Sequence, residues 1–221
     1  MIAEIVDWLD ERLAIRRDLE RALRRTVPEH ATGAIYCLGG IAFLAFLVEV
    51  ITGIALARYY QPNAALAYES VRIITYDVPL GSLVRSLHYW AGNVMIAAML
   101  LHMLRVYFMG AYRKPRELNW IVGVALLLLT FTFGFSGYAL RWDTASYGAT
   151  SIVVLAPASL PFAGAWVIKV FLGDVIITGE TLTRLYFLHV FLLPMTAFVL
   201  MLIHFLIVRR QGIASYGEVT L

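Results

Sequence analysis

Four long apolar stretches dominate the hydrophobic pattern of the chain, and polar segments separate them. They run over about residues 34–60, 83–107, 120–140 and 185–208. Each is long enough for a helix that crosses the hydrocarbon core of a bilayer, which takes about 20 helical residues. The pattern therefore predicts an all-α membrane protein, with a bundle of four transmembrane helices forming one domain over residues 31–212.

The segment before the first stretch alternates charged residues with single apolar ones and has no continuous apolar core. This pattern is typical of an amphipathic helix on the membrane surface, and we expect one over residues 1–30 in place of a cleavable signal peptide. Its apolar stripe would equally suit docking on a partner subunit. A short tail, residues 213–221, follows the bundle.

The long connection between the third and fourth stretches, residues 141–184, contains one further apolar run over residues 152–172. Pro157 and Pro161 interrupt any helix there. A fifth span would also move the two arginines after the fourth stretch to the face opposite the other basic residues. We therefore expect this connection to form short helices that rest at the outer membrane interface.

Composition agrees with a membrane protein and excludes an ordinary soluble domain. Hydrophobic residues make up 61% and charged residues 15%, whereas soluble domains have about 45–50% and about 25%. Twelve of the 18 Lys and Arg residues lie on one predicted face. By the positive-inside rule both termini are cytoplasmic, or stromal in a plastid. We interpret these charges as topology, with the lipid bilayer as partner and no nucleic acid.

Four of the five histidines fall within predicted spans: His88 and His102 in the second, His189 and His204 in the fourth. Histidine in a hydrocarbon region is rare and is a functional hypothesis by default. Separations of 14 and 15 residues place the two rings of each helix within about 40° and about 60° of one another, and about 21–22 Å apart along the axis. Because these helices run parallel, His88 is level with His189, and His102 with His204.

Two facing imidazoles can hold a haem iron by both axial positions, which favours electron transfer because no site remains for oxygen. The two levels therefore predict an outer haem b on His88 and His189 and an inner haem b on His102 and His204. Hydrogen-bonded core histidines are the alternative for any single residue, and a metal-ion transporter is another. A transporter should gather carboxylates and histidines at one depth.

Glycines and basic residues extend this prediction. Missing side chains would let a porphyrin lie close to the backbone, although ordinary helix packing also favours glycine; the candidates are Gly39, Gly53, Gly123, Gly134 and Gly137. Haem propionates need cationic or hydrogen-bonding partners at the membrane surface. The candidates are Arg85 and Arg184 for the outer haem, and Arg116, Lys114 and Arg209 for the inner one. Snorkelling to lipid head groups would explain the same charges.

The chain resembles the cytochrome b6 family, the short cytochromes b of b6f complexes and of related bacterial menaquinol–cytochrome c reductases. The likeness covers nearly the whole chain and rests on segments that include IYCLGG (35–40), RSLHYW (85–90), KPRELNW (114–120), GYALRWD (137–143), TLTRLYFLH (181–189) and HFLIVRRQGI (204–213). It implies a subunit of a quinol–cytochrome c or quinol–plastocyanin oxidoreductase that is not active alone. Its Q cycle would send electrons from an outer quinol-oxidising site to an inner quinone-reducing site.

The resemblance also implies partners: a subunit IV-like protein, a Rieske iron–sulfur protein and a c-type cytochrome, within a complex that is itself a dimer. It implies a third haem, c-type, joined by one thioether to Cys37 beside the inner haem. A lone membrane cysteine would otherwise be interpreted as inert. The segment from Gly134 onward, with Tyr138, Trp142 and Asp143, would form part of the outer quinol pocket.

Two positions depart from the family pattern. Tyr89 stands where a basic residue is usual, and Arg141 where proline is usual. A dihaem cytochrome b anchor of a dehydrogenase or hydrogenase is the competing interpretation, but it would need neither Cys37 nor the long third connection. A bacterial inner membrane is favoured over a thylakoid, and the identity of the quinone stays open.

Overall fold

The computed structural model of the protein describes residues 28–158, 164–171, 173 and 176–214. Nearly all of the expected surface helix and of the C-terminal tail lies outside these residues. Regular structure in the described part is entirely helical, and two short 3-10 turns precede the first long helix. The helices are α3 (Leu38–Ala57), α4 (Ala67–Tyr76), α5 (Gly81–Phe108), α6 (Glu117–Ala139), α7 (Thr144–Ala158), α8 (Gly164–Phe171), α9 (Gly179–Phe187) and α10 (Leu193–Gln211).

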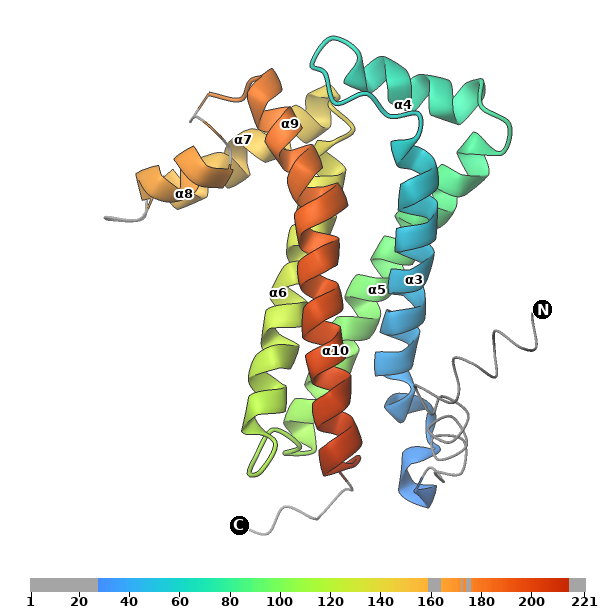
Figure 1. The fold of residues 1–221 in the computed structure, drawn as a ribbon, viewed down its shortest axis with the longest axis vertical. Helices are drawn as coiled ribbons and strands as arrows, with labels where there is room; N and C mark the ends of the chain where they lie inside the picture. The colour runs from blue at the N-terminus through green and yellow to red at the C-terminus, as the bar shows by residue number, and fades with distance from the viewer. Residues whose placement is uncertain (1–27, 159–163, 172, 174–175, 215–221) are drawn as a thin grey trace, which may run out of the picture.

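Within the described residues, four helices are long and apolar enough to cross a membrane, which confirms the predicted four-helix bundle. They are α3, α5, α6 and the continuous helix Gly179–Gln211, which joins α9 to α10. Figure 1 shows them side by side, with α4, α7 and α8 gathered at one end, which we call the outer end of the bundle. The opposite end is the inner end. Ile51, Ile54 and Leu128 are each more than 60% exposed, as expected of side chains that face lipid rather than water.

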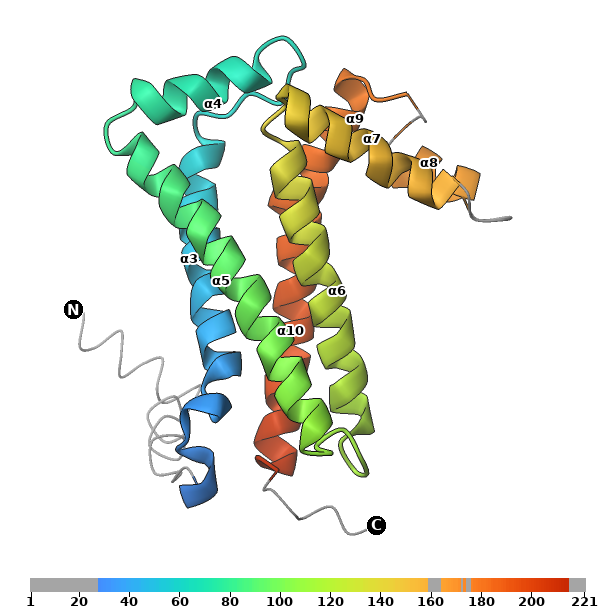
Figure 2. The same ribbon diagram turned by 180° about the vertical axis from the view of Figure 1, so that it is seen from behind.

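The four spans pack as two pairs, α3 with α5 and α6 with α10, and α5 also packs on α6. Seen from behind, α5 crosses the bundle from its outer end beside α3 to its inner end beside α6 (Figure 2). At mid-height Phe46, Met95 and Ala197 are buried together and join α3, α5 and α10. Helices α5 and α10 run in the same direction (Figure 1), so their histidines can pair level by level.

The hydrophobic pattern did not predict α4, which lies across the outer end of the bundle (Figure 1). The chain turns from α4 into α5 at Leu80, which adopts a left-handed φ of 60°. At Gly81 a Cβ atom would lie 1.9 Å from the carbonyl oxygen of Ile74. Only glycine allows this close approach, so the corner that starts the histidine-bearing helix α5 depends on Gly81.

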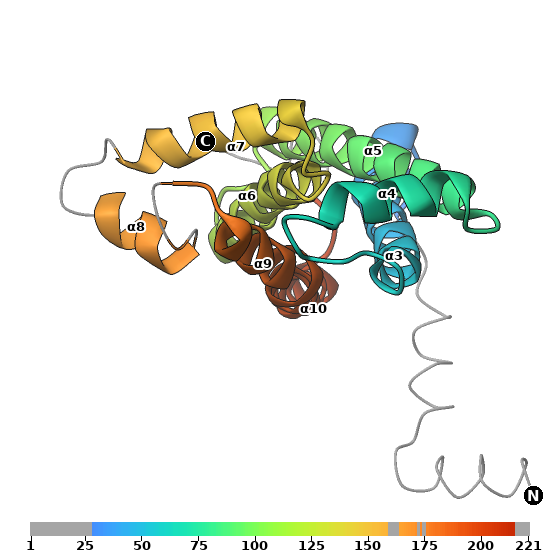
Figure 3. The ribbon, with the colours of Figure 1, turned by 90° about the horizontal axis from the view of Figure 1, so that it is seen from above.

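The connection before the fourth span contains α7 and α8, of 15 and 8 residues. At 1.5 Å per residue both are too short to cross a bilayer. From above they lie across the end of the bundle beside α6 and α9 (Figure 3), so the described part contains no fifth span. The fourth span begins at Gly179, earlier than the hydrophobic pattern predicts, because the Thr178 and Thr181 side chains form a capping box.

Within the fourth span, residues Leu188–Leu192 form one π-helical turn that contains His189. Pro194 lies two residues after this turn, and proline has no N–H to continue the regular α-helical bonding pattern. A π-helical turn accommodates one extra residue in an otherwise α-helical span, and such turns are frequent at functional sites.

Candidate haem-binding site

The structure brings the four intramembrane histidines together in two facing pairs. The ring centres of His88 and His189 are 6.3 Å apart with an angle of 74° between the planes. Those of His102 and His204 are 6.5 Å apart at 79°. A metal–nitrogen bond of about 2 Å on each side, with the half-widths of two imidazole rings, spans about 6 Å between ring centres. Both pairs therefore fit a single iron held between two axial imidazoles.

The π-helical turn explains how unequal sequence separations produce matching pairs. His88 and His102 are 14 residues apart, whereas His189 and His204 are 15 apart. The turn Leu188–Leu192 takes up the extra residue. The ring of His189 therefore faces α5 at the outer level while that of His204 faces α5 at the inner level.

In the outer pair, each histidine packs against a glycine of the neighbouring helix. A Cβ atom on Gly53 of α3 would lie 3.3 Å from His88 Cε1, and one on Gly137 of α6 would lie 2.8 Å from His189 Cε1. Ordinary carbon–carbon contacts are about 3.5–4.0 Å. These two positions therefore need glycine if the rings are to stay where they face one another.

The inner pair repeats this close approach at His102, whereas at His204 the glycine lies at an ordinary contact distance. A Cβ atom on Gly39 of α3 would lie 3.3 Å from His102 Cε1, and one on Gly123 of α6 would lie 4.0 Å from His204 Cε1. Gly134 differs, because its nearest neighbour is Ile96 of α5 at 3.1 Å. Of the five glycines singled out in the sequence, four lie beside histidines and Gly134 serves helix packing.

Hydroxyl groups orient the outer rings. Thr52 Oγ1 donates to the carbonyl oxygen of Val48 at 2.6 Å and lies 2.9 Å from His88 Nδ1. Ser136 Oγ donates to the carbonyl oxygen of Thr132 at 2.7 Å and lies 2.9 Å from His189 Nδ1. Each hydroxyl, having used its hydrogen, accepts the Nδ1–H. Nε2 of each ring keeps its lone pair for a metal.

Sequence reasoning missed Thr52 and Ser136, and also Glu49, whose Oε2 lies 2.9 Å from His88 Nδ1. Two signals were present. Each hydroxyl residue directly precedes a glycine that packs on a histidine, in Thr52-Gly53 and Ser136-Gly137. Glu49 is an acidic residue well inside an apolar span, and ionisable residues there default to function.

A cavity of about 280 Å³ opens at the inner level, between the helices of the bundle. Its lining includes Tyr36, His102, Arg105, Arg116, Asn119 and His204. Within the described part of the chain, buried polar atoms of five of these residues have no hydrogen-bond partner: His102 Nδ1, Arg105 Nη2, Arg116 Nε, Asn119 Oδ1 and His204 Nδ1. Buried polar groups are normally satisfied, so this cavity fits a cofactor that carries anionic groups.

The inner candidates for propionate contacts differ in whether they line the inner cavity. Arg116 lines the cavity, and so does Arg105, whose guanidinium lies 4.0 Å from the centre of the Tyr36 ring. Lys114 and Arg209 are exposed and do not line it. Arg105 was not among the sequence candidates for this contact, although its place three residues after His102 mirrors that of Arg85 three residues before His88.

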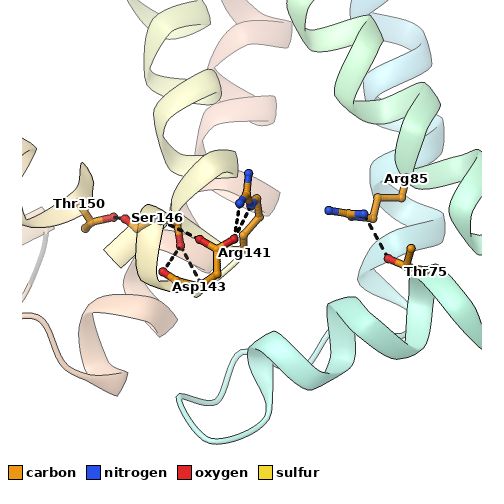
Figure 4. Close-up of polar contacts among 6 residues, drawn as sticks. All are labelled: Thr75, Arg85, Arg141, Asp143, Ser146 and Thr150. Atoms are coloured by element: carbon orange, nitrogen blue, oxygen red, sulfur yellow. Dashed lines mark hydrogen bonds and ion pairs between the residues drawn. The ribbon is translucent and has the colours of Figure 1, made fainter. Parts of the chain in front are cut away.

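At the outer end, Arg85 extends from α5 toward the α6–α7 corner, where Arg141 pairs with Asp143 (Figure 4). They line a pocket of about 190 Å³ together with Arg72 and Asp143. Arg85 Nη1 donates to Thr75 Oγ1 at 3.2 Å, and no carboxylate pairs with Arg85 among the described ion pairs. This pocket is therefore cationic.

Arg184, the second outer candidate, lies elsewhere. Its Nη2 is 2.5 Å from Glu180 Oε1, and its Nη1 donates to the carbonyl oxygen of Lys169 at 3.0 Å. It lines neither cavity. Its contacts tie α9 to α8 at the edge of the outer surface.

The residues expected at the outer quinol pocket lie at the α6–α7 corner. The Arg141 guanidinium is 4.9 Å from the centre of the Tyr138 ring. Trp142 turns the chain with a left-handed φ of 53°. Asp143 pairs with Arg141 and caps α7, accepting the Ser146 N–H at 2.8 Å. Although partial burial opposes it, these bonds hold the pKa of Asp143 below its usual range.

Cys37 stands at the N-terminal end of α3 with an exposed side chain. Its neighbours Tyr36 and Gly39 line the inner cavity, and Cys37 itself does not. The structure therefore places Cys37 in the chain between two residues of the cavity wall, at the inner level.

The fold and the paired histidines define a four-helix haem protein of the membrane. The family model described as cytochrome b/b6/petB matches residues 24–212. Proteins named cytochrome b6 from Pyropia yezoensis and Chlamydomonas reinhardtii are 45% and 42% identical to this chain, each over 97% of it and 99% of the relative. The chain belongs to the cytochrome b/b6 family, and it is therefore a haem b-carrying subunit of a quinol oxidoreductase complex.

A solved structure shares this fold. A chain of a structure titled "Hyperthermophilic respiratory Complex III" is 29% identical and superposes with a TM-score of 0.84. The match covers 98% of this chain and 59% of the complex III chain. The protein is integral to the membrane, with four apolar helices in the described residues.

Proposed function

We propose that this subunit carries electrons across the membrane, from an outer site of quinol oxidation to an inner site of quinone reduction. The observation that carries the proposal is the pair of levels, with ring centres 6.3 Å apart at His88 and His189 and 6.5 Å apart at His102 and His204. Each level suits one haem b, and haem with two axial imidazoles favours electron transfer over ligand binding.

The haems supply one-electron redox chemistry when bound. The chain contributes their ligands, orientation and surroundings. Gly53 and Gly137 leave room for the outer rings, while Thr52 and Ser136 keep the proton on Nδ1. The apolar side chains of the bundle exclude water between the two levels.

Propionate contacts follow from the two cavities. We assign Arg85 to the outer haem, since it lines a cationic pocket and no described ion pair joins it to a carboxylate. Arg105 and Arg116 serve the inner haem, because both line the inner cavity with buried unpartnered nitrogens. The bond between Arg184 and Glu180 argues against a propionate role for Arg184.

A third haem, c-type, is proposed at Cys37. Its thiol is exposed at the start of α3, next to Tyr36 and Gly39 in the wall of the inner cavity. A thioether there would hold a haem beside the inner haem b, close to the Arg105 guanidinium.

We assign the outer quinol pocket to the α6–α7 corner, with Tyr138, Trp142 and Asp143.

The partners proposed are a subunit IV-like protein, a Rieske iron–sulfur protein and a c-type cytochrome, in a dimeric complex. The first and last described segments lie at the same end of the bundle (Figure 1), and twelve of the 18 Lys and Arg residues precede the first span, join the second to the third or follow the fourth in the sequence. Both ends are then cytoplasmic by the positive-inside rule, in a bacterial inner membrane.

The test is a redox titration of the purified complex, with absorbance spectra and haem content recorded together. We expect two haem b transitions per chain and reduction of both haems when a quinol is added. A purified complex without haem b, or with haem that no quinol reduces, would contradict the proposal.

A further inference from the structure

Glu49 is a carboxylate well inside the membrane-spanning helix α3, and its side chain is only 15% exposed. Ionisable groups at such depth are costly and are usually functional. We propose that Glu49 is a positioning residue that acts through His88 and lowers the reduction potential of the outer haem. The inference rests on the proposed function, because it requires His88 to bind the iron.

The hydrogen bonds around His88 fix the direction of the interaction. Glu49 Oε2 and Thr52 Oγ1 both lie 2.9 Å from His88 Nδ1. The Thr52 hydroxyl donates its hydrogen to the carbonyl oxygen of Val48 at 2.6 Å. Both neighbours of Nδ1 therefore act as acceptors, so Nδ1 carries the hydrogen and donates it to the Glu49 carboxylate.

A carboxylate that accepts the Nδ1–H of a metal-bound histidine makes that ligand more basic, and so favours the more oxidised metal. The negative charge also opposes the arrival of an electron at a nearby centre, and this repulsion is stronger in a low-dielectric bundle than in water. Both effects have the same sign, and each lowers the reduction potential.

Among the described residues, the packing around Glu49 offers this charge no partner other than His88. Its second oxygen, Oε1, is buried and has no hydrogen-bond partner in the described part of the chain. A Cβ atom on Gly92 of α5 would lie 3.5 Å from Oε1, so the glycine leaves space beside the carboxylate. Apart from His88, no basic side chain pairs with Glu49 among the described ion pairs.

The arrangement is specific to one of the four histidines. His189 Nδ1 lies 2.9 Å from the neutral hydroxyl of Ser136, and no described ion pair joins His189 to a carboxylate. In the inner pair, Nδ1 of His102 has no hydrogen-bond partner among the described residues. Glu49 therefore acts on the outer haem alone and makes electron transfer from the outer to the inner level more favourable.

The test is a redox titration of the intact complex that carries Glu49→Gln, with the two haem b signals resolved. Glutamine keeps the size of the side chain and an oxygen acceptor, but removes the charge. We expect both haems to be retained, an upward shift of the outer potential and no shift of the inner one. A matched control is Glu117→Gln at the inner start of α6, which should shift neither.

A second variant keeps the inference testable where Glu49→Gln fails to assemble. Thr52→Val leaves the carboxylate as the sole acceptor at Nδ1, so the outer potential should stay at or below that of the wild type. A rise in Thr52→Val, or an unmoved outer potential in Glu49→Gln, would overturn the role of Glu49. A wild-type complex without two haem b transitions would instead overturn the proposed function itself.

Discussion

Gly137 packs so closely on His189 that a Cβ atom on the glycine would lie 2.8 Å from Cε1 of the ring. The contact joins α6 to the π-helical turn of the fourth span. Because the ring is already bonded to Ser136 through Nδ1 and would bind iron through Nε2, it cannot swing away without losing one of the two. Metal binding by His189 therefore depends on the absence of a side chain at Gly137 in the neighbouring helix.

We predict that Gly137→Ala removes most of the outer haem while leaving the inner haem in place. The added methyl group displaces the His189 ring from its partner His88. Haem content and low-temperature absorbance spectra of the variant complex measure this loss. The control is Gly148→Ala in α7, where a Cβ atom meets nothing within 4 Å, and full outer haem in Gly137→Ala would contradict the packing argument.

Replacing either histidine of one level should remove the single haem of that level. His88→Ala or His189→Ala should remove the outer haem, and His102→Ala or His204→Ala the inner one, because each iron takes one ligand from each helix. The measurement is the haem b to protein ratio, which should fall by about half in each variant. Loss of the same haem in the His88 and His102 variants would refute the two-level arrangement.

Cys37→Ser should abolish covalent haem and spare both haem b signals. Non-covalent haem is lost in denaturing detergent, whereas a thioether survives. Haem peroxidase staining of a denaturing gel should show a band at this subunit in the wild type and none in the variant. An intact mass equal to that of the bare polypeptide would show that Cys37 carries no haem.

Arg85→Gln and Arg184→Gln should behave differently, although both arginines precede an outer histidine in sequence. Hydrogen bonds to charged groups contribute about 1.5–3 kcal/mol, so losing Arg85 should make outer haem release roughly 10- to 100-fold easier. Removing its positive charge should also lower the outer potential. Arg184 is bonded to Glu180 and lines neither cavity, so its variant should match the wild type in both measurements.

The spans and the pairing of the histidines could be predicted from the sequence because they depend on local regularities. An apolar stretch of about 20 residues is a property of the segment itself. Helical periodicity places His88 and His102 on one face whatever surrounds the helix. Parallel direction of the second and fourth spans then follows from their order along the chain.

Other features arise only when distant segments meet. The bonds of His88 to Thr52 and of His189 to Ser136 join residues 36 and 53 positions apart, so the segment around each histidine does not by itself reveal the partner. We assign a propionate contact to Arg85 and not to Arg184 for a similar reason. Arg184 is bonded to the nearby Glu180 carboxylate and also to the backbone of α8, which is more distant in the sequence.

The sequence by itself determined four membrane spans and two levels of facing histidines, because apolar length and helical period are properties of each segment alone. The tertiary structure decided how each ring is held. The π-helical turn at Leu188–Leu192, the contact of Gly137 with His189 and the carboxylate of Glu49 beside His88 depend on how neighbouring helices approach one another. Such distances are set by packing of side chains from separate helices, which periodicity along one helix does not contain.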